Sequence, residues 1–331
     1  MNFKKLVFIP MVAVLLAGCT TGGGGGGRKR TSTTDTPTDT TAPSDPTTTS
    51  KTDVPIVTGS VINDNYYDLS KYQLNGLRGA KLQFELHRLM LDTHQSVVLY
   101  SQWKNYESST SDRTYSIDTK NKSTSKNEFF YTGKEVAYST TGTREHVWPC
   151  AKSAGLWVHS NYSDIKYYVD GSGYWGGGSD LYHVRPCTSA VNTARGDSKY
   201  TEFTAEEKAS GKLYAMGDGG PYSLLCDAER FSTKSEPADE FKGDIARLCM
   251  YVYVHYAKLG DYNDETCGNL ALTDVFYGET KNAAYEMIAR WNELDPVSET
   301  EKLRNETVMA IQGNRNPFVD YPHLVRLALG I

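Results

Sequence analysis

Apolar residues recur every three or four positions in several stretches of the chain, which is the spacing of an amphipathic helix. The clearest case comprises Leu82, Leu86, Leu89 and Met90. This pattern predicts helices over residues 79–92, 243–256 and 283–294. The Asp-Pro dipeptide at 295–296 is typical of an N-cap with proline at the first helical position, and it predicts a fourth helix that ends at Gly313.

The strand signals are weaker than the helical ones. Residues 128–139 are rich in aromatic and β-branched side chains and predict a strand, whereas 103–127 is polar and predicts a loop. The sequence has no internal repeat and no glycine-rich phosphate-binding loop. The elements together predict an α+β fold that is mostly helical. The composition stays globular from about Tyr66 to Ile331, so residues 56–331 are expected to form a single domain.

The first 18 residues have the layout of a secretory signal, with two lysines, an apolar run from Leu6 to Leu16, and small residues before Cys19. The apolar run is too short to span a bilayer comfortably. Residues 16–19, Leu-Ala-Gly-Cys, resemble a bacterial lipobox, which implies cleavage before Cys19 and attachment of diacylglycerol to its thiol. We therefore expect a lipoprotein anchored to a membrane outside the cytoplasm. The alternative is an ordinary signal peptide that happens to contain a cysteine.

Residues 19–55 are expected to form a disordered tether that begins at the lipidated Cys19. Of the 35 positions from 20 to 54, 25 are Thr, Ser, Pro or Gly, and only Ala42 and Val54 are aliphatic. Such a composition offers too little apolar surface to offset the entropy of ordering the backbone.

Composition and charge narrow the function classes. The chain has 331 residues, of which 39% are hydrophobic, and a formal charge of -5. This charge excludes a globally basic nucleic-acid binder, so a polyanion would have to be held by a local cluster of charge. Six cysteines in a chain of this length exclude a small scaffold built on disulfides.

Two short clusters, 144–149 and 180–186, contain residue types that suit phosphodiester hydrolysis. Glu145 supplies a carboxylate oxygen, and Asn192, just beyond the second cluster, supplies an amide oxygen. Hard cations such as Mg²⁺, Mn²⁺ and Ca²⁺ prefer oxygen ligands of this kind. A neutral imidazole on His146 can remove a proton from water near neutral pH.

Basic side chains near the same clusters suit a phosphate. Arg185 and Arg195 can hold phosphate oxygens through charged hydrogen bonds, and Arg144 is a further candidate for substrate binding. His183 could support the site with a hydrogen bond or contact a phosphate. Arg315 could bind substrate or brace the C-terminal turn, because the run around it is rich in turn formers.

The sequence resembles the secreted bacterial endonuclease I family in several separated motifs that occur in the family's order. They are Arg-Glu-His-Val-Trp-Pro at 144–149, Asp-Leu-Tyr-His-Val-Arg-Pro at 180–186, Val-Asn-Thr-Ala-Arg-Gly at 191–196 and Gln-Gly-Asn-Arg-Asn-Pro-Phe at 312–318. The resemblance implies a ββα-metal (His-Me finger) active site in which Glu145 and Asn192 bind the metal and His146 is the general base. Tyr182 occupies the position where a second histidine is expected beside His183.

The resemblance also implies an activity. We expect a metal-dependent endonuclease that cleaves DNA, RNA or both with little sequence preference. Mg²⁺ is the expected cofactor, with Mn²⁺ or Ca²⁺ as alternatives, and a monomer is the expected state.

The same clusters contain a second constellation. His146 with Cys150, and His183 with Cys187, form a Cys₂His₂ set that could bind structural zinc, which would make the region a binding module rather than an enzyme. An extracytoplasmic compartment favours disulfides over thiolates, and zinc would leave the neighbouring acid, amide and arginines without a shared purpose. Cys150 and Cys187 could instead form a disulfide, with Cys249, on the apolar side of a predicted helix, as an inert free thiol.

Two histidines, His87 and His94, lie on or near the first predicted helix with no partner at a matching spacing in the sequence. We interpret both as structural.

Overall fold

The computed structural model describes residues 65–96, 98, 103–104, 117–121, 126–138, 140–149, 177–256 and 270–331. The chain divides into two units, Met1–Ile56 and Val57–Ile331, and every described residue belongs to the second. The predicted signal peptide, the lipidation site Cys19, the tether and Cys150 lie outside the described residues. Within the described part, no helix combines the length and the apolar character needed to cross a bilayer.

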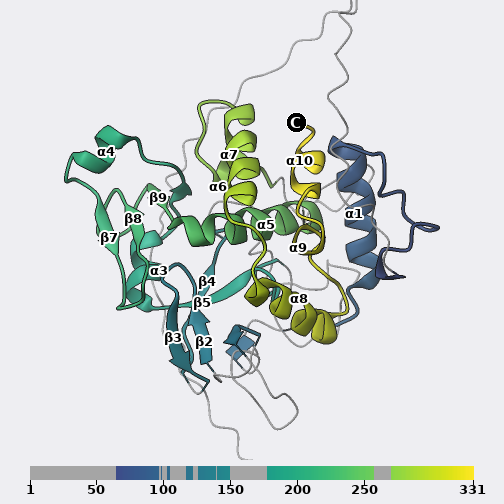
Figure 1. The fold of residues 1–331 in the computed structure, drawn as a ribbon, viewed down its shortest axis with the longest axis horizontal. Helices are drawn as coiled ribbons and strands as arrows, with labels where there is room; N and C mark the ends of the chain where they lie inside the picture. The colour runs from purple at the N-terminus through teal and green to yellow at the C-terminus, as the bar shows by residue number, and fades with distance from the viewer. Residues whose placement is uncertain are drawn as a thin grey trace, which may run out of the picture. The chain divides into compact units, whose positions relative to one another are not determined.

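The second unit has an α+β fold, as predicted (Figure 1). Its described helices are η1 (Asn65–Tyr67), α1 (Gly79–Thr93), α3 (Ser189–Arg195), α4 (Ala205–Ala209), α5 (Asp239–Tyr256), α6 (Leu272–Val275), α7 (Lys281–Leu294), α8 (Glu299–Gln312), α9 (Pro317–Asp320) and α10 (Leu324–Leu329). The described strands are β1 (Thr119–Asn121), β2 (Lys126–Phe129), β3 (Lys134–Ala137), β4 (Thr143–His146), β5 (Val184–Cys187), β6 (Lys199–Tyr200), β7 (Tyr214–Met216), β8 (Leu224–Cys226) and β9 (Lys234–Glu236). They form sheets in the orders β1-β2-β3, β4-β5 and β6-β9-β8-β7, in which only β6 and β9 pair in parallel.

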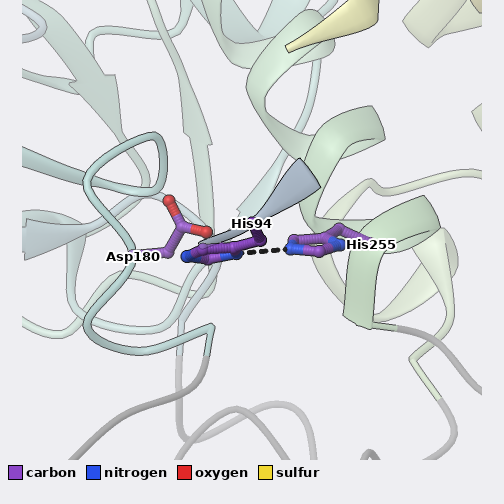
Figure 2. Close-up of side chains that lie close together, drawn as sticks. All are labelled: His94, Asp180 and His255. Carbon is purple, nitrogen blue, oxygen red and sulfur yellow. Dashed lines mark hydrogen bonds between the residues drawn. The ribbon is translucent and has the colours of Figure 1, made fainter. Parts of the chain in front are cut away.

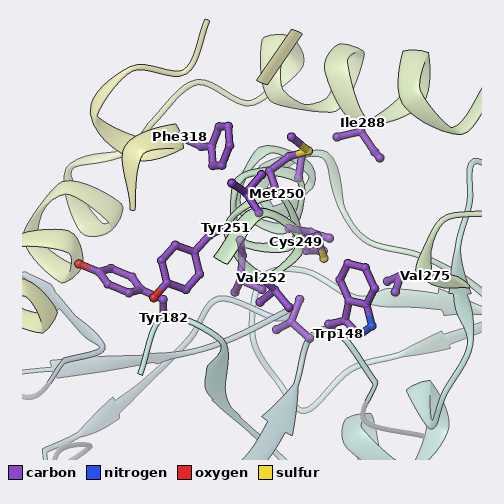
Figure 3. Packing of buried hydrophobic residues seen from close by; sticks show 14 of the residues in the cluster. Trp148, Tyr182, Cys249, Met250, Tyr251, Val252, Val275, Ile288 and Phe318 are labelled. Atoms are coloured by element: carbon purple, nitrogen blue, oxygen red, sulfur yellow. The ribbon is translucent and has the colours of Figure 1, made fainter. Parts of the chain in front are cut away.

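The helix α5 lies at the centre of the core. Fourteen of its 18 residues are buried, so it is covered on nearly all sides rather than along one stripe. Helices α7, α1 and α9 pack against it. In Figure 3, Met250 of α5 lies near Ile288 of α7 and Phe318 of α9, while Tyr251 lies beside Tyr182. The loop before β5 is thus packed directly on the core helix.

Three of the predicted helices are confirmed with small changes at their ends. The predicted segments 79–92, 243–256 and 283–294 correspond to α1, α5 and α7. The fourth helix ends at Gly313 as predicted, where φ is +91° and a residue with a Cβ would be strained.

The predicted start of the fourth helix is wrong, and Gly243 of α5 explains why. A Cβ at Gly243 would lie 2.0 Å from the carbonyl oxygen of Asp295, and the Gly243 N–H donates to the Asp295 carboxylate at 2.9 Å. Asp295 is therefore held against α5 as the C-cap of α7. Helix α8 begins at Glu299, after a capping box in which Ser298 and Glu301 satisfy each other's backbone N–H groups.

The predicted single strand over 128–139 is also wrong. This segment forms most of a hairpin, in which β2 and β3 pair antiparallel across a turn. Tyr131 and Gly133 in that turn have φ values of +70° and +64°. The expected loop over 103–127 contains β1 and the first residues of β2. The turn matters for function because it directs Tyr131 toward Glu145.

Strands β4 and β5 bring the two sequence clusters together and lead into α3. In the antiparallel pair, Glu145 lies opposite Arg185 and His146 lies opposite Val184. Helix α3, which contains Asn192, begins two residues after β5 and packs against β4. The strand–strand–helix order therefore places the predicted acid, imidazole and amide in one region.

Candidate active site

Two adjacent residues at the end of β4 have different surroundings. Because side chains alternate along a strand, Glu145 and His146 point to opposite faces. The Glu145 side chain is buried, with 2% of its residue surface exposed, whereas His146 is half-buried. The strand end thus presents a fully buried carboxyl group next to a histidine that keeps partial contact with solvent.

The Glu145 carboxyl group is held at one of its two oxygens. Tyr131 donates its hydroxyl to Oε1 at 2.7 Å, and Nε of Arg195 lies 3.5 Å from the same oxygen. Oε2 is therefore the oxygen that remains for a cation. Burial raises the pKa of Glu145 to about 7, although Arg195 and the Tyr131 hydrogen bond act in the opposite direction. A bound cation would favour the deprotonated form.

The carbonyl group of Gly178 orients His146. Nε2 of the ring lies 2.7 Å from the Gly178 oxygen. A carbonyl oxygen only accepts hydrogen bonds, so we infer that Nε2 carries the proton and Nδ1 carries the lone pair. Burial lowers the pKa of His146 to about 4, and the positive charges of Arg144 and Arg195 lower it further. The imidazole is therefore neutral at physiological pH, in the tautomer in which Nδ1 can accept a proton.

His183 supports the loop that orients His146. Its Nδ1 lies 2.6 Å from the carbonyl oxygen of Gly177, and the Trp148 N–H donates to its Nε2 at 3.0 Å. Burial lowers the pKa of His183 to about 3, which keeps the ring neutral. The centroids of the His146 and His183 rings are 5.4 Å apart. Both nitrogens of His183 have backbone partners, which corresponds to the supporting alternative rather than to phosphate contact.

Helix α3 holds Asn192 near β4. Its Nδ2 donates to the carbonyl oxygen of Arg144 at 3.3 Å, so the amide oxygen is the atom that remains for a ligand. The end of the helix is capped from outside, because the N–H of Phe231 donates to the carbonyl oxygen of Thr193 at 3.2 Å. This bond fixes the helix turn from which Asn192 reaches toward the strand.

Arg185, predicted to bind phosphate, lies in a buried ion-pair network. Its Nε donates to Oδ1 of Asp118 at 3.1 Å, and Arg304 donates to the same oxygen at 3.0 Å. Its guanidinium carbon lies 4.4 Å from the centroid of the Phe130 ring. Direct contact with a phosphate would require Arg185 to leave these partners.

Arg195 is fully buried, with 0% of its surface exposed. Its Nη2 donates to the carbonyl oxygen of Val147 at 2.7 Å, Nη1 donates to Gly196 at 3.0 Å, and its guanidinium lies over the ring of Tyr200. Together with the ion pair to Glu145, these contacts hold β4 and the residues after it. The guanidinium group of Arg195 is therefore surrounded by groups of the protein.

Arg144 differs from these two arginines because it is half-buried. It lies two residues before His146 on β4, so the two side chains share a face of the strand. Its charge lowers the pKa of His146, which indicates that the two groups are close. Of the three arginines predicted near the site, Arg144 is the one that keeps partial exposure to solvent.

Residues 78–323 match the model of the endonuclease I family. The chain belongs to the endonuclease I family. It is 30% identical over 282 residues to an extracellular ribonuclease of Bacillus amyloliquefaciens, a match that covers 81% of this chain and 78% of the relative. An extracellular ribonuclease of Bacillus subtilis (strain 168) is 29% identical over 271 residues, which cover 78% and 76% of the two chains. Endonuclease-1 of Buchnera aphidicola subsp. Baizongia pistaciae (strain Bp) is 25% identical over 142 residues, which cover 43% and 46%. These matches support a nuclease.

Arg315 of this endonuclease I family member braces the C-terminal turn. Its Nε donates to the carboxylate of Asp320 at 2.7 Å, and its Nη2 donates to Glu306 at 2.6 Å. Two carboxylates already surround the guanidinium, which corresponds to the bracing alternative rather than to substrate binding.

Two of the cysteines named in the sulfur predictions lie in the described part of the chain. Cys187 is a buried thiol that donates to the carbonyl oxygen of Thr188. Its predicted bridge to Cys150 stays a prediction, because Cys150 lies outside the described residues. The expectation that Cys249 is a free, buried thiol is confirmed. Within the described residues, neither Cys187 nor His183 belongs to a cluster that could hold a metal ion, so the zinc module is not favoured.

Several residues that hold the site are not marked by any motif in the sequence. Tyr131 contacts both Glu145 and the hydroxyl of Tyr200, and Tyr200 in turn donates to the carbonyl oxygen of Val147. Asp118 accepts hydrogen bonds from two buried arginines. These partners come from separate elements, so no spacing along the chain reveals them.

Proposed function

We propose that the protein is an extracytoplasmic, metal-dependent nuclease that hydrolyses phosphodiester bonds in RNA, DNA or both. The observation on which the proposal rests is the pair at the end of β4, a buried carboxyl group on Glu145 beside a neutral His146 whose Nδ1 carries the lone pair. The order β4, β5, α3 supports a ββα-metal site. Two relatives are named as extracellular ribonucleases, which makes RNA the first substrate to test.

The donor set fits a hard divalent cation. Oε2 of Glu145 and the amide oxygen of Asn192 are the charged and neutral oxygen ligands that Mg²⁺ accepts, and a site with few protein ligands leaves positions for water and phosphate. The pKa of Glu145, raised to about 7, is a second point in favour, because a cation would offset the cost of burying the carboxylate. When bound, Mg²⁺ would stabilise the negative charge that develops on the phosphate and the leaving oxygen.

Side chains of the protein supply proton transfer, phosphate binding and the positioning of both. His146 accepts a proton from the attacking water at Nδ1, while the carbonyl group of Gly178 keeps the other ring proton on Nε2. Arg144, on the same face of β4, binds the substrate phosphate. Arg195 and Arg185 are positioning residues, because their guanidinium groups are committed to buried partners.

The test is cleavage of RNA and of single- and double-stranded DNA by the purified full-length protein, with Mg²⁺ and with EDTA. His146→Ala should reduce the rate by about two to four orders of magnitude, the usual contribution of a positioned general base. His323→Ala, at the start of α10, is the matched control and should cleave normally. Cleavage that survives EDTA, or that is unaffected by His146→Ala, would contradict the proposal.

Membrane attachment through Cys19 is a separate part of the proposal. It is supported by the Leu-Ala-Gly-Cys motif at 16–19. Cys19→Ser should move the protein from the membrane fraction of expressing cells to the soluble fraction, while the nuclease activity per molecule stays the same. A Cys19→Ser protein that remains with the membranes would refute lipid anchoring without affecting the nuclease assignment.

A further inference from the structure

Three buried side chains that can bind metals meet at the last turn of the core helix α5 (Figure 2). They are His94, which follows α1, His255 in the last turn of α5, and Asp180 in the loop before β5. Each offers one ligand atom, and these atoms lie within 4.8 Å of one another. In Figure 2 the ring of His94 lies between the Asp180 carboxyl group and the ring of His255. His94 therefore has partners in other parts of the chain, which its spacing in the sequence did not reveal.

The spacing of the two imidazoles suits a shared cation. Nδ1 of His94 and Nε2 of His255 are 3.0 Å apart. Two imidazole nitrogens bound to one Zn²⁺ at about 2.0–2.1 Å with near-tetrahedral angles would be roughly 3.3 Å apart. The separation is thus within a few tenths of an ångström of the value that a shared ion requires, and binding would move the proton of the donating nitrogen to the other nitrogen of its ring and turn both lone pairs toward the ion. The carboxylate needs a larger movement to reach the same point.

The groups that donate hydrogen bonds to Asp180 fix the orientation of its carboxyl group but do not neutralise its negative charge. Oδ1 accepts from the Tyr182 N–H and from Gln312, and Oδ2 accepts from the hydroxyl groups of Tyr251 and Tyr256. All four donors are neutral, and within the described residues no lysine or arginine forms an ion pair with Asp180. Only 2% of its surface is exposed. A buried carboxylate ordinarily requires a compensating positive charge.

The neighbouring histidines do not supply that charge readily. Burial lowers the pKa of His94, and it lowers the pKa of His255 well below its usual value, with His94 and His87 acting in the same direction. Asp180 acts in the opposite direction on His94, but burial is the larger effect, so a positive charge on either ring is disfavoured. Neutral imidazoles have the lone pairs that a metal ion needs, and the metal ion would provide the missing charge.

We propose that His94, His255 and Asp180 form a structural site for one Zn²⁺-class ion. Two imidazole nitrogens and one carboxylate oxygen are a ligand set that Zn²⁺ and its late transition-metal neighbours accept, whereas Mg²⁺ and Ca²⁺ prefer oxygen ligands alone. This site shares no residue with the Glu145 and Asn192 pair, and its nitrogen ligands favour a different class of metal.

The ion would join three parts of the chain that position the candidate active site. It would link the end of α1 and the end of α5 to the loop that contains Asp180. The same loop presents the carbonyl groups of Gly177 and Gly178, which accept hydrogen bonds from His183 and His146. The expected effect of the ion is therefore stability of this loop, with no direct part in phosphodiester chemistry.

The test is direct metal binding by the full-length protein. Protein stripped of metal with a chelator is titrated with Zn²⁺ in excess Mg²⁺ by calorimetry, and the bound zinc is counted by mass spectrometry. We expect one Zn²⁺ per chain and an apparent melting temperature that rises with Zn²⁺. His255→Gln should weaken binding by at least about a hundredfold, since even the loss of an outer partner costs 10- to 100-fold. His323→Gln is the matched control and should bind like the wild type.

Three results would overturn the site. They are no stoichiometric Zn²⁺ in the wild-type protein, unchanged binding in a folded His255→Gln protein, and loss of the zinc in Cys187→Ser instead. If His255→Gln does not fold, the visible absorption spectrum of the wild-type protein loaded with Co²⁺ provides the test. The visible bands of a four-coordinate ion without a thiolate-to-cobalt band support the site, and their absence refutes it.

Discussion

The acid limb of the pH–rate profile should be set by Glu145 and should move with the Mg²⁺ concentration. The reason is the contrast between two neighbouring groups on β4. Burial raises the pKa of Glu145 to about 7 and lowers the pKa of His146 to about 4. As pH falls through neutrality, Glu145 gains a proton and loses its affinity for a cation, whereas His146 stays neutral. The carboxyl group, and not the imidazole, is therefore expected to limit activity first.

The size of the shift follows from competition between the proton and the cation. Only the deprotonated carboxylate binds Mg²⁺, so the midpoint falls by the logarithm of one plus the ratio of Mg²⁺ to its dissociation constant. At a hundredfold excess over that constant the midpoint should fall by about two pH units, from about 7 to about 5, equivalent to about 2.7 kcal/mol. The imidazole of His146 would still be neutral there.

The assay is the initial rate of RNA cleavage across a pH range that spans both pKa values, at several Mg²⁺ concentrations and constant ionic strength. Tyr131→Phe provides a matched variant, because it removes a hydrogen bond that favours the charged form of Glu145. Its acid limb should lie at higher pH than that of the wild type at the same Mg²⁺ concentration. An acid limb that does not move with Mg²⁺ would refute the assignment of Glu145 as the metal ligand.

The remaining predictions concern the amide and the three arginines. Asn192→Ala should weaken the apparent Mg²⁺ affinity, and excess Mg²⁺ should restore part of the rate; a variant with normal Mg²⁺ dependence would remove Asn192 from the ligand set. Arg144→Ala should flatten the dependence of substrate binding on salt by about one phosphate contact, which a filter-binding titration with inactive protein can measure. Arg185→Ala and Arg195→Ala should instead lower the free energy of unfolding, each by about 3–5 kcal/mol in urea titrations, because each leaves a buried partner uncompensated. Wild-type stability in both variants, together with a changed salt dependence of substrate binding, would instead indicate that these arginines bind the substrate.

The helices could be predicted because the sequence pattern that specifies a helix lies within the helix itself. A helix satisfies its backbone groups within four residues, so an apolar repeat such as that in α1 is sufficient to place it. The hairpin formed by β2 and β3 could not be predicted in the same way. Aromatic residues favour a strand, but the positive φ of Tyr131 is imposed by packing of the turn and leaves no mark in the composition.

The same division applies to the active-site chemistry. The motifs around positions 145, 146 and 192 are sufficient to place the chain in the endonuclease I family, and the resemblance implies the roles that we propose for these residues. Their protonation cannot be read in this way. The pKa of Glu145 depends on burial, on Tyr131 and on Arg195, which reach it from another sheet and from α3.

The sequence by itself determined the α+β class, three of the four predicted helices and the identity of the motif residues. Only the tertiary structure decided that two predicted phosphate-binding arginines are buried and that His94 has partners. The contact between His94 and His255 joins residues 161 positions apart, and Asp180 reaches them from a third segment. The physical reason is that burial, ion pairing and metal-ligand geometry depend on distances in space, which spacing along the chain encodes only within a single element.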